Sequence, residues 1–309
     1  MASWIANMSK LFEALSKGQD LLPNGELNSL VDGQVDKTTP PAPAISLFDE
    51  EEIATAPIAQ SHHFQGAIGS ARVVTLQVAP LAPILPFDGT HSGAGEQYRM
   101  LRTRISQNPK SPQVIAITSS GPNDGKSVTA VNLAGALALK GEQRVLLIDG
   151  DFRRSTIADQ LGLNPTPGLA EILTGQTTLH EALIQAQQIA PLFILPAGEP
   201  SGNPVELLDC SLWREFLEYC RAEFKYIIID SPPLGVVADY DLIQASCDGA
   251  ILVVRPDHTD RQLTLKALTT IPKDKFIGVV LNCVEPWFLH RQRTYPGYYH
   301  YPARTSQSA

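Results

Sequence analysis

A short stretch near the middle of the chain combines small residues, a lysine and a serine in an order suited to binding a polyphosphate. It reads SSGPNDGKS from Ser119 to Ser127, between an apolar run and a segment of good helix formers. Small residues let backbone N–H groups turn inward on phosphates, and the next helix adds its positive dipole end. We expect Lys126 to reach the β- and γ-phosphates and the Ser127 hydroxyl to bind Mg²⁺. The strict pattern has glycine where Ser120 stands, and a small side chain there can still make the turn at some steric cost.

Three aspartates follow apolar segments further along the chain. Asp149 and Asp151 come after the segment 144–148, and Asp230 closes the segment 226–229. Alternate residues of an extended chain point the same way, so Asp149 and Asp151 could both face the γ-phosphate. One could hold Mg²⁺ or its water, and the other could accept a proton from a hydroxyl nucleophile. A strand end with a helix-capping aspartate is the alternative, and it suits one aspartate better than two. Asp230 has the position of a Walker B aspartate, which steers the Mg²⁺ shell.

Strands and helices alternate around these residues, which predicts an α/β fold. The expected strands are 114–118, 144–148, 193–195, 226–229, 250–254 and 277–281. The expected helices are 129–140, 168–174, 178–187, 205–221 and 262–268. Such an order predicts a doubly wound, mostly parallel sheet of the P-loop NTPase type, with helices on both faces. Ligands of open α/β sheets bind at the carboxyl ends of the strands, where the phosphate loop and the aspartates lie.

The residues before this domain differ in character. An apolar stripe at helical spacing marks a short N-terminal helix, and it consists of Ile5, Met8, Leu11, Phe12 and Leu15. The Pro-rich piece 38–44 and the acidic run 49–52 have the composition of a linker, and 71–78 is a candidate strand. We therefore predict a largely disordered N-terminal extension with an amphipathic helix over 1–92, a P-loop kinase or ATPase domain over 93–288, and a Tyr-rich tail over 289–309.

Composition and charge narrow the classes of partner. The 309 residues have 43% hydrophobic content, which suffices for one large α/β domain. A net charge of −8 argues against broad nucleic-acid binding. No stretch approaches the ~20 apolar residues of a membrane span, and the start of the chain lacks the pattern of a signal peptide. We expect a soluble, intracellular protein that a partner would hold at any membrane.

The last residues and one helix carry further chemistry. Half of the eight tyrosines lie in the tail, interleaved with Pro and Gly: Tyr295, Tyr298, Tyr299 and Tyr301. An ordinary disordered tail is the alternative, but such segments usually lack aromatic residues. Accessible hydroxyls beside a phosphoryl-transfer site are candidate substrates. Glu96, Arg99 and Arg102 step by three along a predicted helix, so they form either a solvated charged strip or a subunit interface.

The order of these motifs resembles that of the bacterial tyrosine kinases, the autokinases of capsule and exopolysaccharide assembly. The resemblance rests on the phosphate loop, on LLIDGDFR from Leu146, on IIIDSPP from Ile227 and on the Tyr-rich tail. It covers about two thirds of the chain, from Gly95 onward. In that family the first three of these motifs are called, in order, Walker A, Walker A′ and Walker B. The loop here has Asn123 and Asp124 where the family commonly has Gly and Glu, and the tail is short, with Pro and Gly interrupting its tyrosines.

The resemblance implies ATP and Mg²⁺ as cofactors, and it assigns roles to particular residues. The implied catalytic residues are Lys126, Asp149, Asp151 and Asp230, and the implied metal ligands are Ser127, Asp149 and Asp230. The implied nucleotide contacts are Gly121, Pro122, Asn123, Asp124, Gly125, Lys126, Ser127, Val128 and Asn282. The four tail tyrosines would accept phosphate. Glu96, Arg99 and Arg102 match a motif that builds a ring, in which the tail of one subunit enters the site of the next.

The resemblance also implies a partner and a location. Residues 8–15 resemble the start of free-standing family members that depend on a separate membrane protein. We therefore expect a membrane-anchored polysaccharide co-polymerase as activator, a homo-oligomeric ring, and a cytoplasmic protein recruited to the inner face of the membrane. Two alternatives stay open: a partition or site-selection ATPase, and a nucleotide-gated scaffold without kinase activity. Partition ATPases usually carry an extra lysine where Gly121 stands, which argues against the first.

Overall fold

The computed structural model describes residues 68, 71–78, 84, 92–141 and 143–284. All of them belong to the second of two units into which the chain divides, residues 62–309. The apolar stripe near the N-terminus, the Pro-rich piece and the tail tyrosines lie outside the described residues. Among the helices that are described, none has both the length and the hydrophobicity of a membrane span.

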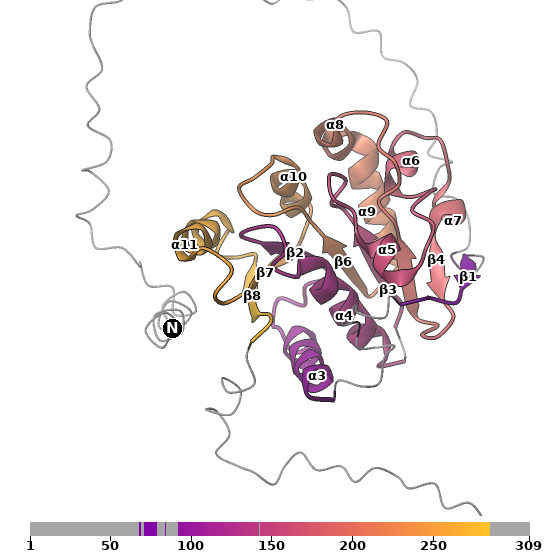
Figure 1. Cartoon of the computed structure of the whole chain (residues 1–309). Coiled ribbons are helices and arrows are strands. Elements are labelled where there is room, and N and C mark those ends of the chain that lie inside the picture. The colour runs from indigo at the N-terminus through magenta and orange to yellow at the C-terminus, as the bar shows by residue number, and fades with distance from the viewer. Residues whose placement is uncertain (1–67, 69–70, 79–83, 85–91, 142, 285–309) are drawn as a thin grey trace, which may run out of the picture. The chain divides into compact units, whose positions relative to one another are not determined.

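One eight-stranded sheet forms the centre of the domain (Figure 1). In spatial order its strands are β1 (Arg72–Val74), β4 (Ile184–Ala186), β5 (Leu192–Leu195), β3 (Val145–Asp149), β6 (Tyr226–Asp230), β2 (Val114–Ser119), β7 (Gly249–Val254) and β8 (Phe276–Leu281). Every neighbouring pair is parallel except β4 and β5, which are antiparallel. The sequence prediction of a mostly parallel, doubly wound sheet is confirmed.

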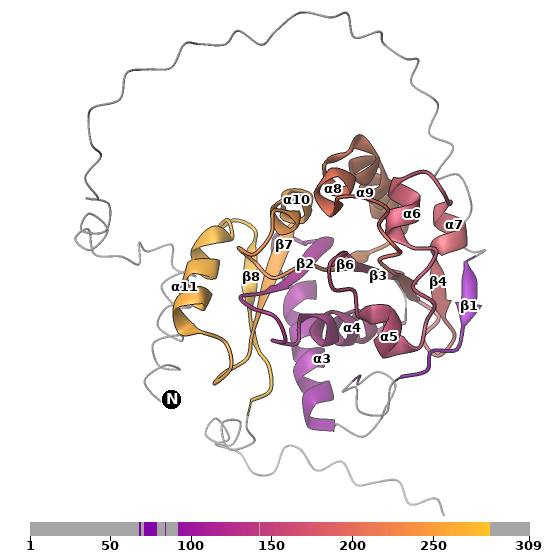
Figure 2. The ribbon, with the colours of Figure 1, turned by 45° about the horizontal axis from the view of Figure 1, so that its top comes forward.

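Helices cover both faces of this sheet. They are α3 (Ser92–Ser106), α4 (Lys126–Ala138), α5 (Ile157–Leu161), α6 (Leu169–Leu173), α7 (Leu179–Ala182), α8 (Pro204–Asp209), α9 (Ser211–Glu223), α10 (Asp239–Ala245) and α11 (Arg261–Thr270). Figure 2 shows α3, α4 and α5 on one side of the strands and α8, α9 and α10 on the other. Strands β2, β3 and β7 are buried at every position, as expected for parallel strands covered on both faces.

Helix α4 is enclosed on nearly all sides. All of its residues except Val128 are buried, because the sheet covers one face and α3 covers the opposite face. Its Ala-rich, apolar sequence suits a helix that is hydrophobic all round. The enclosure fixes the start of α4, at Lys126, directly after the phosphate loop.

The strand order brings the acidic residues to the phosphate loop. Strand β6 lies between β3 and β2, and its Asp230 pairs in register with Asp149 on one side and with Ile117 on the other. Paired residues of adjacent strands lie about 5 Å apart. Two aspartates and the phosphate loop therefore share one edge of the sheet, as predicted.

Two predicted helices are wrong in part. Only Leu179–Ala182 of the segment 178–187 is helical, and β4 follows it. A capping box between Thr178 and Glu181 starts this helix, but Leu183 is extended because the next residues pair with β1 and β5. The helix expected over 205–221 is two helices, α8 and α9, separated by extended backbone at Cys210.

Candidate active site

The phosphate loop gets its curvature from two residues with left-handed backbone. Gly125 has a φ of 91°, and Asn123 has a φ of 64°. Asparagine is among the few residues other than glycine that adopt this conformation readily, so the loop makes its turn although it is poor in glycine. No side chain caps the first turn of α4 after Gly125. The N–H groups of that turn are therefore available to an anion.

Lys126 lies between two aspartates at the end of this loop. Its Nζ is 2.7 Å from Asp151 Oδ2 and 3.7 Å from Asp230 Oδ1, and all three side chains are buried. Nζ also donates to Ser127 Oγ over 3.5 Å. Burial alone would lower the pKa of Lys126, but the charges of Asp230 and Asp151 outweigh it and raise the pKa. The lysine is a fixed positive charge.

Asp149 is held by backbone groups that follow it in the chain. The N–H groups of Thr156 and Ile157 donate to Oδ2 over 3.2 and 3.1 Å, and that of Asp151 donates to Oδ1 over 3.3 Å. Burial, and then the charge of Asp230, raise the pKa of Asp149 to about 8. This carboxyl shapes the Walker A′ loop and is poised to hold a proton near neutral pH.

Asp230 differs from Asp149 in its hydrogen bonding. It is fully buried, and neither carboxylate oxygen has a hydrogen-bond partner among the described residues. Burial raises the pKa of Asp230 to about 6, against the attraction of Lys126. Buried polar groups without partners are costly and uncommon. Three carboxylates around one lysine make a site that a divalent cation would neutralise.

A cavity of about 370 Å³ opens beside these groups. Its polar side is formed by the phosphate loop with Lys126 and Asp151, and by the loop that follows Asp151. Its apolar side comes from the loop after β6: Pro232, Pro233, Val236 and Val237. Val236 is 65% exposed, so this wall faces a ligand or solvent and not the core.

Comparisons with known proteins assign this arrangement to a family. The AAA domain model matches residues 112–271. Tyrosine-protein kinase CpsD of Streptococcus pneumoniae serotype 4 is 36% identical over 195 residues, which are 61% of this chain and 84% of CpsD. The solved kinase domain of Escherichia coli tyrosine kinase ETK aligns with a TM-score of 0.61 at 25% identity, over 71% of this chain and 85% of that domain. The chain belongs to the bacterial tyrosine-protein kinase family.

One relative is much longer than this chain and is named as a transport protein. The succinoglycan biosynthesis transport protein ExoP of Rhizobium meliloti is 35% identical over 175 residues, which are 55% of this chain and 22% of ExoP. This kinase therefore matches about a fifth of ExoP, whereas it matches most of CpsD.

The residues of the kinase fit a magnesium-bound nucleotide. Ser127 and the uncapped start of α4 line the cavity, and Asp230, whose oxygens accept no hydrogen bond among the described residues, lies 3.7 Å from Lys126 Nζ. No group of three or more His, Cys, Asp or Glu residues in the described part forms a metal site by itself. Mg²⁺ does not require one, because it takes one or two protein ligands and completes its shell with phosphate oxygens and water.

Sequence reasoning missed the ion pair that joins the two loops beside the cavity. Arg153 Nε and Nη2 donate to Asp239 Oδ2 and Oδ1 over 2.8 and 3.1 Å. Arg153 follows the Walker A′ aspartates, and Asp239 starts α10 after the Walker B loop. The motif drew attention to Arg153, but no pattern marked Asp239. The pair joins the loops that carry Asp151 and the apolar wall.

Four other predicted residues do not line the cavity, and they are Glu96, Arg99, Arg102 and Asn282. On α3, Arg99 Nη1 donates to Glu96 Oε2 over 2.6 Å, and Arg102 Nη1 donates to the Ala136 carbonyl of α4 over 3.2 Å. Arg102 is thus attached to its own subunit, while Glu96 and Arg99 form a partly exposed local pair. Asn282 lies against the phosphate loop, where its Nδ2 donates to the Asp124 carbonyl over 2.9 Å.

Proposed function

We propose that this kinase transfers the γ-phosphate of ATP to the tyrosines of its own tail, from one subunit to the next. The observation that carries the proposal is the convergence of Lys126, Asp151 and Asp230 beside an uncapped helix start and a cavity. Phosphoryl transfer depends mainly on position and charge neutralisation, and these groups supply both.

Each residue then has a distinct task. The loop N–H groups and Lys126 bind the β- and γ-phosphates, and Ser127 and Asp230 hold the metal. Bound Mg²⁺ supplies charge neutralisation on the phosphate oxygens. Asp149 or Asp151 takes the proton of the attacking phenol. The raised pKa of Asp149 leaves this carboxyl largely protonated near neutral pH, so it can accept the phenol proton only from its deprotonated form, whereas the ion pair with Lys126 keeps Asp151 close to the phosphates.

The apolar wall supports an aromatic acceptor. A tyrosine ring needs apolar contact on its body and a polar region at its hydroxyl. The cavity offers both, since Pro233 and Val236 lie on one side and Lys126 and Asp151 on the other. A water nucleophile, as in a partition ATPase, would make no use of that wall.

The biological setting is part of the same proposal. We infer a role in capsule or exopolysaccharide polymerisation and export, supported by the motif resemblance and by the likeness to ExoP. We also infer a ring built through Glu96, Arg99 and Arg102, with a membrane-anchored co-polymerase as activator. Recruitment to the inner face of the membrane follows from that partner. The division into 1–92, 93–288 and 289–309 and the acceptor role of the four tail tyrosines remain proposals.

The test is an anti-phosphotyrosine blot of the purified chain with ATP and Mg²⁺. We expect signal from the wild type and none from Lys126→Met. Lys140→Met is the matched control, because Lys140 is an exposed lysine just after the same helix and away from the cavity. Deletion of residues 289–309 should remove the signal while nucleotide binding persists. ATP turnover without phosphotyrosine would indicate a partition-type ATPase. The absence of both activities would support the nucleotide-gated scaffold.

Transfer between subunits needs its own experiment. An inactive Lys126→Met chain with its tail is mixed with an active chain that lacks 289–309. Phosphorylation of the inactive chain supports transfer between subunits. An unlabelled inactive chain, alongside a wild type that labels itself, contradicts it.

A further inference from the structure

Asp124 of the phosphate loop is buried and bonded at three points. It is 1% exposed, and three groups from different parts of the chain bind it. Its Oδ2 accepts from the Gly121 N–H over 3.1 Å, which fastens the loop to itself. Its Oδ1 accepts from the Thr259 hydroxyl over 2.7 Å, and its carbonyl accepts from Asn282 over 2.9 Å. The loop is therefore held from outside as well as from within.

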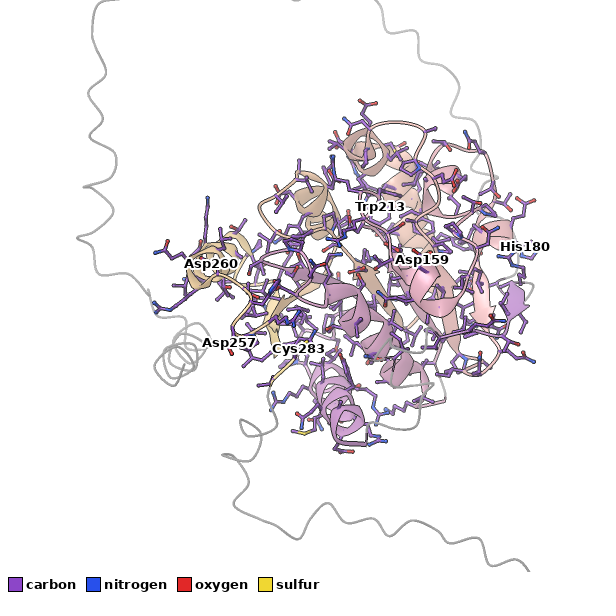
Figure 3. The ribbon with its side chains drawn as sticks, in the orientation of Figure 1. Asp159, His180, Trp213, Asp257, Asp260 and Cys283 are labelled. Carbon is purple, nitrogen blue, oxygen red and sulfur yellow. The ribbon has the colours of Figure 1, made fainter. Side chains whose placement is uncertain are left out.

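Thr259 is itself held firmly. It lies in the connection between β7 and α11, where its Oγ1 accepts from the Arg255 N–H and its own N–H donates to the Arg255 carbonyl, both over 2.9 Å. The next residue, Asp260, caps α11 by accepting from the Leu263 N–H over 2.9 Å. Figure 3 labels Asp257 and Asp260, which flank this threonine in the sequence. A hydroxyl between a strand end and a capped helix start has little freedom.

The hydrogen bond from Asn282 to the Asp124 carbonyl restrains the same part of the loop. Gly125 leaves no space on that side, since a Cβ built there would lie 1.9 Å from Asn282 Nδ2. Asn282 thus packs on the residue just before Lys126, and Thr259 holds the carboxylate one residue earlier. Charge-assisted hydrogen bonds are stronger than neutral ones, so the Thr259 contact is a substantial restraint.

We propose that Thr259 is a positioning residue for the phosphate loop, acting through Asp124 on Gly121. It holds the loop N–H groups in the orientation that a polyphosphate needs. Its single hydroxyl proton faces two acceptors, and the shorter, charge-assisted bond to Asp124 at 2.7 Å is favoured over the Arg255 carbonyl at 2.9 Å. Thr259 therefore acts without touching the nucleotide itself. The inference rests on the proposed nucleotide binding, and it adds a residue outside every motif that sequence reasoning used.

The test compares three variants of the full chain. Thr259→Val keeps the shape and removes the hydroxyl, and Thr259→Ser keeps the hydroxyl. Thr264→Val is the matched control, because Thr264 is a fully buried threonine on α11 whose hydroxyl donates to the Asp260 carbonyl and does not reach the loop. Two quantities are measured: the Kd of ADP with Mg²⁺, and hydrogen exchange of peptides covering residues 119–125 in the nucleotide-free protein. Thermal unfolding reports whether each variant is folded.

We expect Thr259→Val to raise the Kd about tenfold, since one charge-assisted hydrogen bond is lost, and to speed exchange in the loop. Thr259→Ser should restore both values to near wild type, and Thr264→Val should change neither. Unchanged binding and exchange in Thr259→Val would overturn the inference, and so would an equal effect of Thr264→Val. A folded wild type that binds no nucleotide would instead refute the proposed function. The exchange measurement would still decide the role of Thr259.

Discussion

The charge of Asp149 makes the stability of the nucleotide-free protein depend on pH. Burial and the neighbouring Asp230 raise the pKa of Asp149 to about 8, from an ordinary value of 3.8. A carboxyl with a raised pKa keeps its proton in the folded state after the unfolded chain has released it. The stabilisation from this proton is fully present when the pH is below the pKa of the unfolded chain. It is lost as the pH rises toward the folded-state pKa of about 8.

The magnitude follows from the two pKa values. Between about pH 6.5 and about pH 7.5, Asp149 should remove roughly 1 kcal/mol from the free energy of unfolding. Asp230, whose pKa is about 6, should remove only about 0.1 to 0.2 kcal/mol over the same interval. A change of roughly 1 kcal/mol is large against the 5–15 kcal/mol that is typical of whole domains.

Urea unfolding at the two pH values measures this loss. We expect the wild type to lose roughly 1 kcal/mol and Asp149→Asn to lose only a small fraction of it. The amide oxygen of Asn can still accept from Thr156 and Ile157, so the fold of the loop should survive. Asp159→Asn is the control, because Asp159 is an exposed carboxylate on the nearby helix α5 (Figure 3). Equal pH dependence in the wild type and Asp149→Asn would refute the burial argument.

Two further predictions concern the ion pair at Asp248 and the shape of the loop. Asp248→Asn should lower the free energy of unfolding by about 2 kcal/mol at neutral pH, because Arg221 donates to both oxygens over 2.8 Å. A double-mutant cycle with Arg221→Met measures the coupling, and additive effects would contradict it. The Asp248 pKa is lowered: burial opposes this, but the bonds from Arg221 and the backbone prevail, so this contribution should fade at acid pH. Gly125→Ala should abolish nucleotide binding through strain and collision with Asn282, whereas Gly202→Ala, at a glycine of another loop where an added Cβ would meet nothing within 4 Å, should bind normally. Equal binding by both variants would refute the argument.

The position of the candidate active site could be predicted because its residues lie at the carboxyl ends of strands. Lys126 and Asp151 follow buried strands and Asp230 ends one, and parallel strands bring their carboxyl ends together. Only the distances and the strand order needed the structure. The turn at Asn123 is a smaller case, since its residue type permits the left-handed backbone that the structure shows.

The contacts that hold the loops could not be predicted in this way. Arg153 and Asp239 are 86 residues apart, and Thr259 and Asp124 are 135 apart. Periodicity reports which face of an element is buried, but not which two loops meet. Strand β4 was missed for a related reason, because three residues are too short for a pattern and only the pairing with β1 and β5 makes them extended.

The bond from Asn282 to the Asp124 carbonyl has a practical consequence for shortened versions of the protein. Asn282 follows β8 directly and lies just ahead of the predicted tail. A truncation placed before it would remove the amide that packs on Gly125, so the resulting protein would fail to bind nucleotide for a reason unrelated to acceptor tyrosines. Boundaries for expression should therefore retain β8 together with Asn282, so that a loss of phosphotyrosine reports on the tail alone.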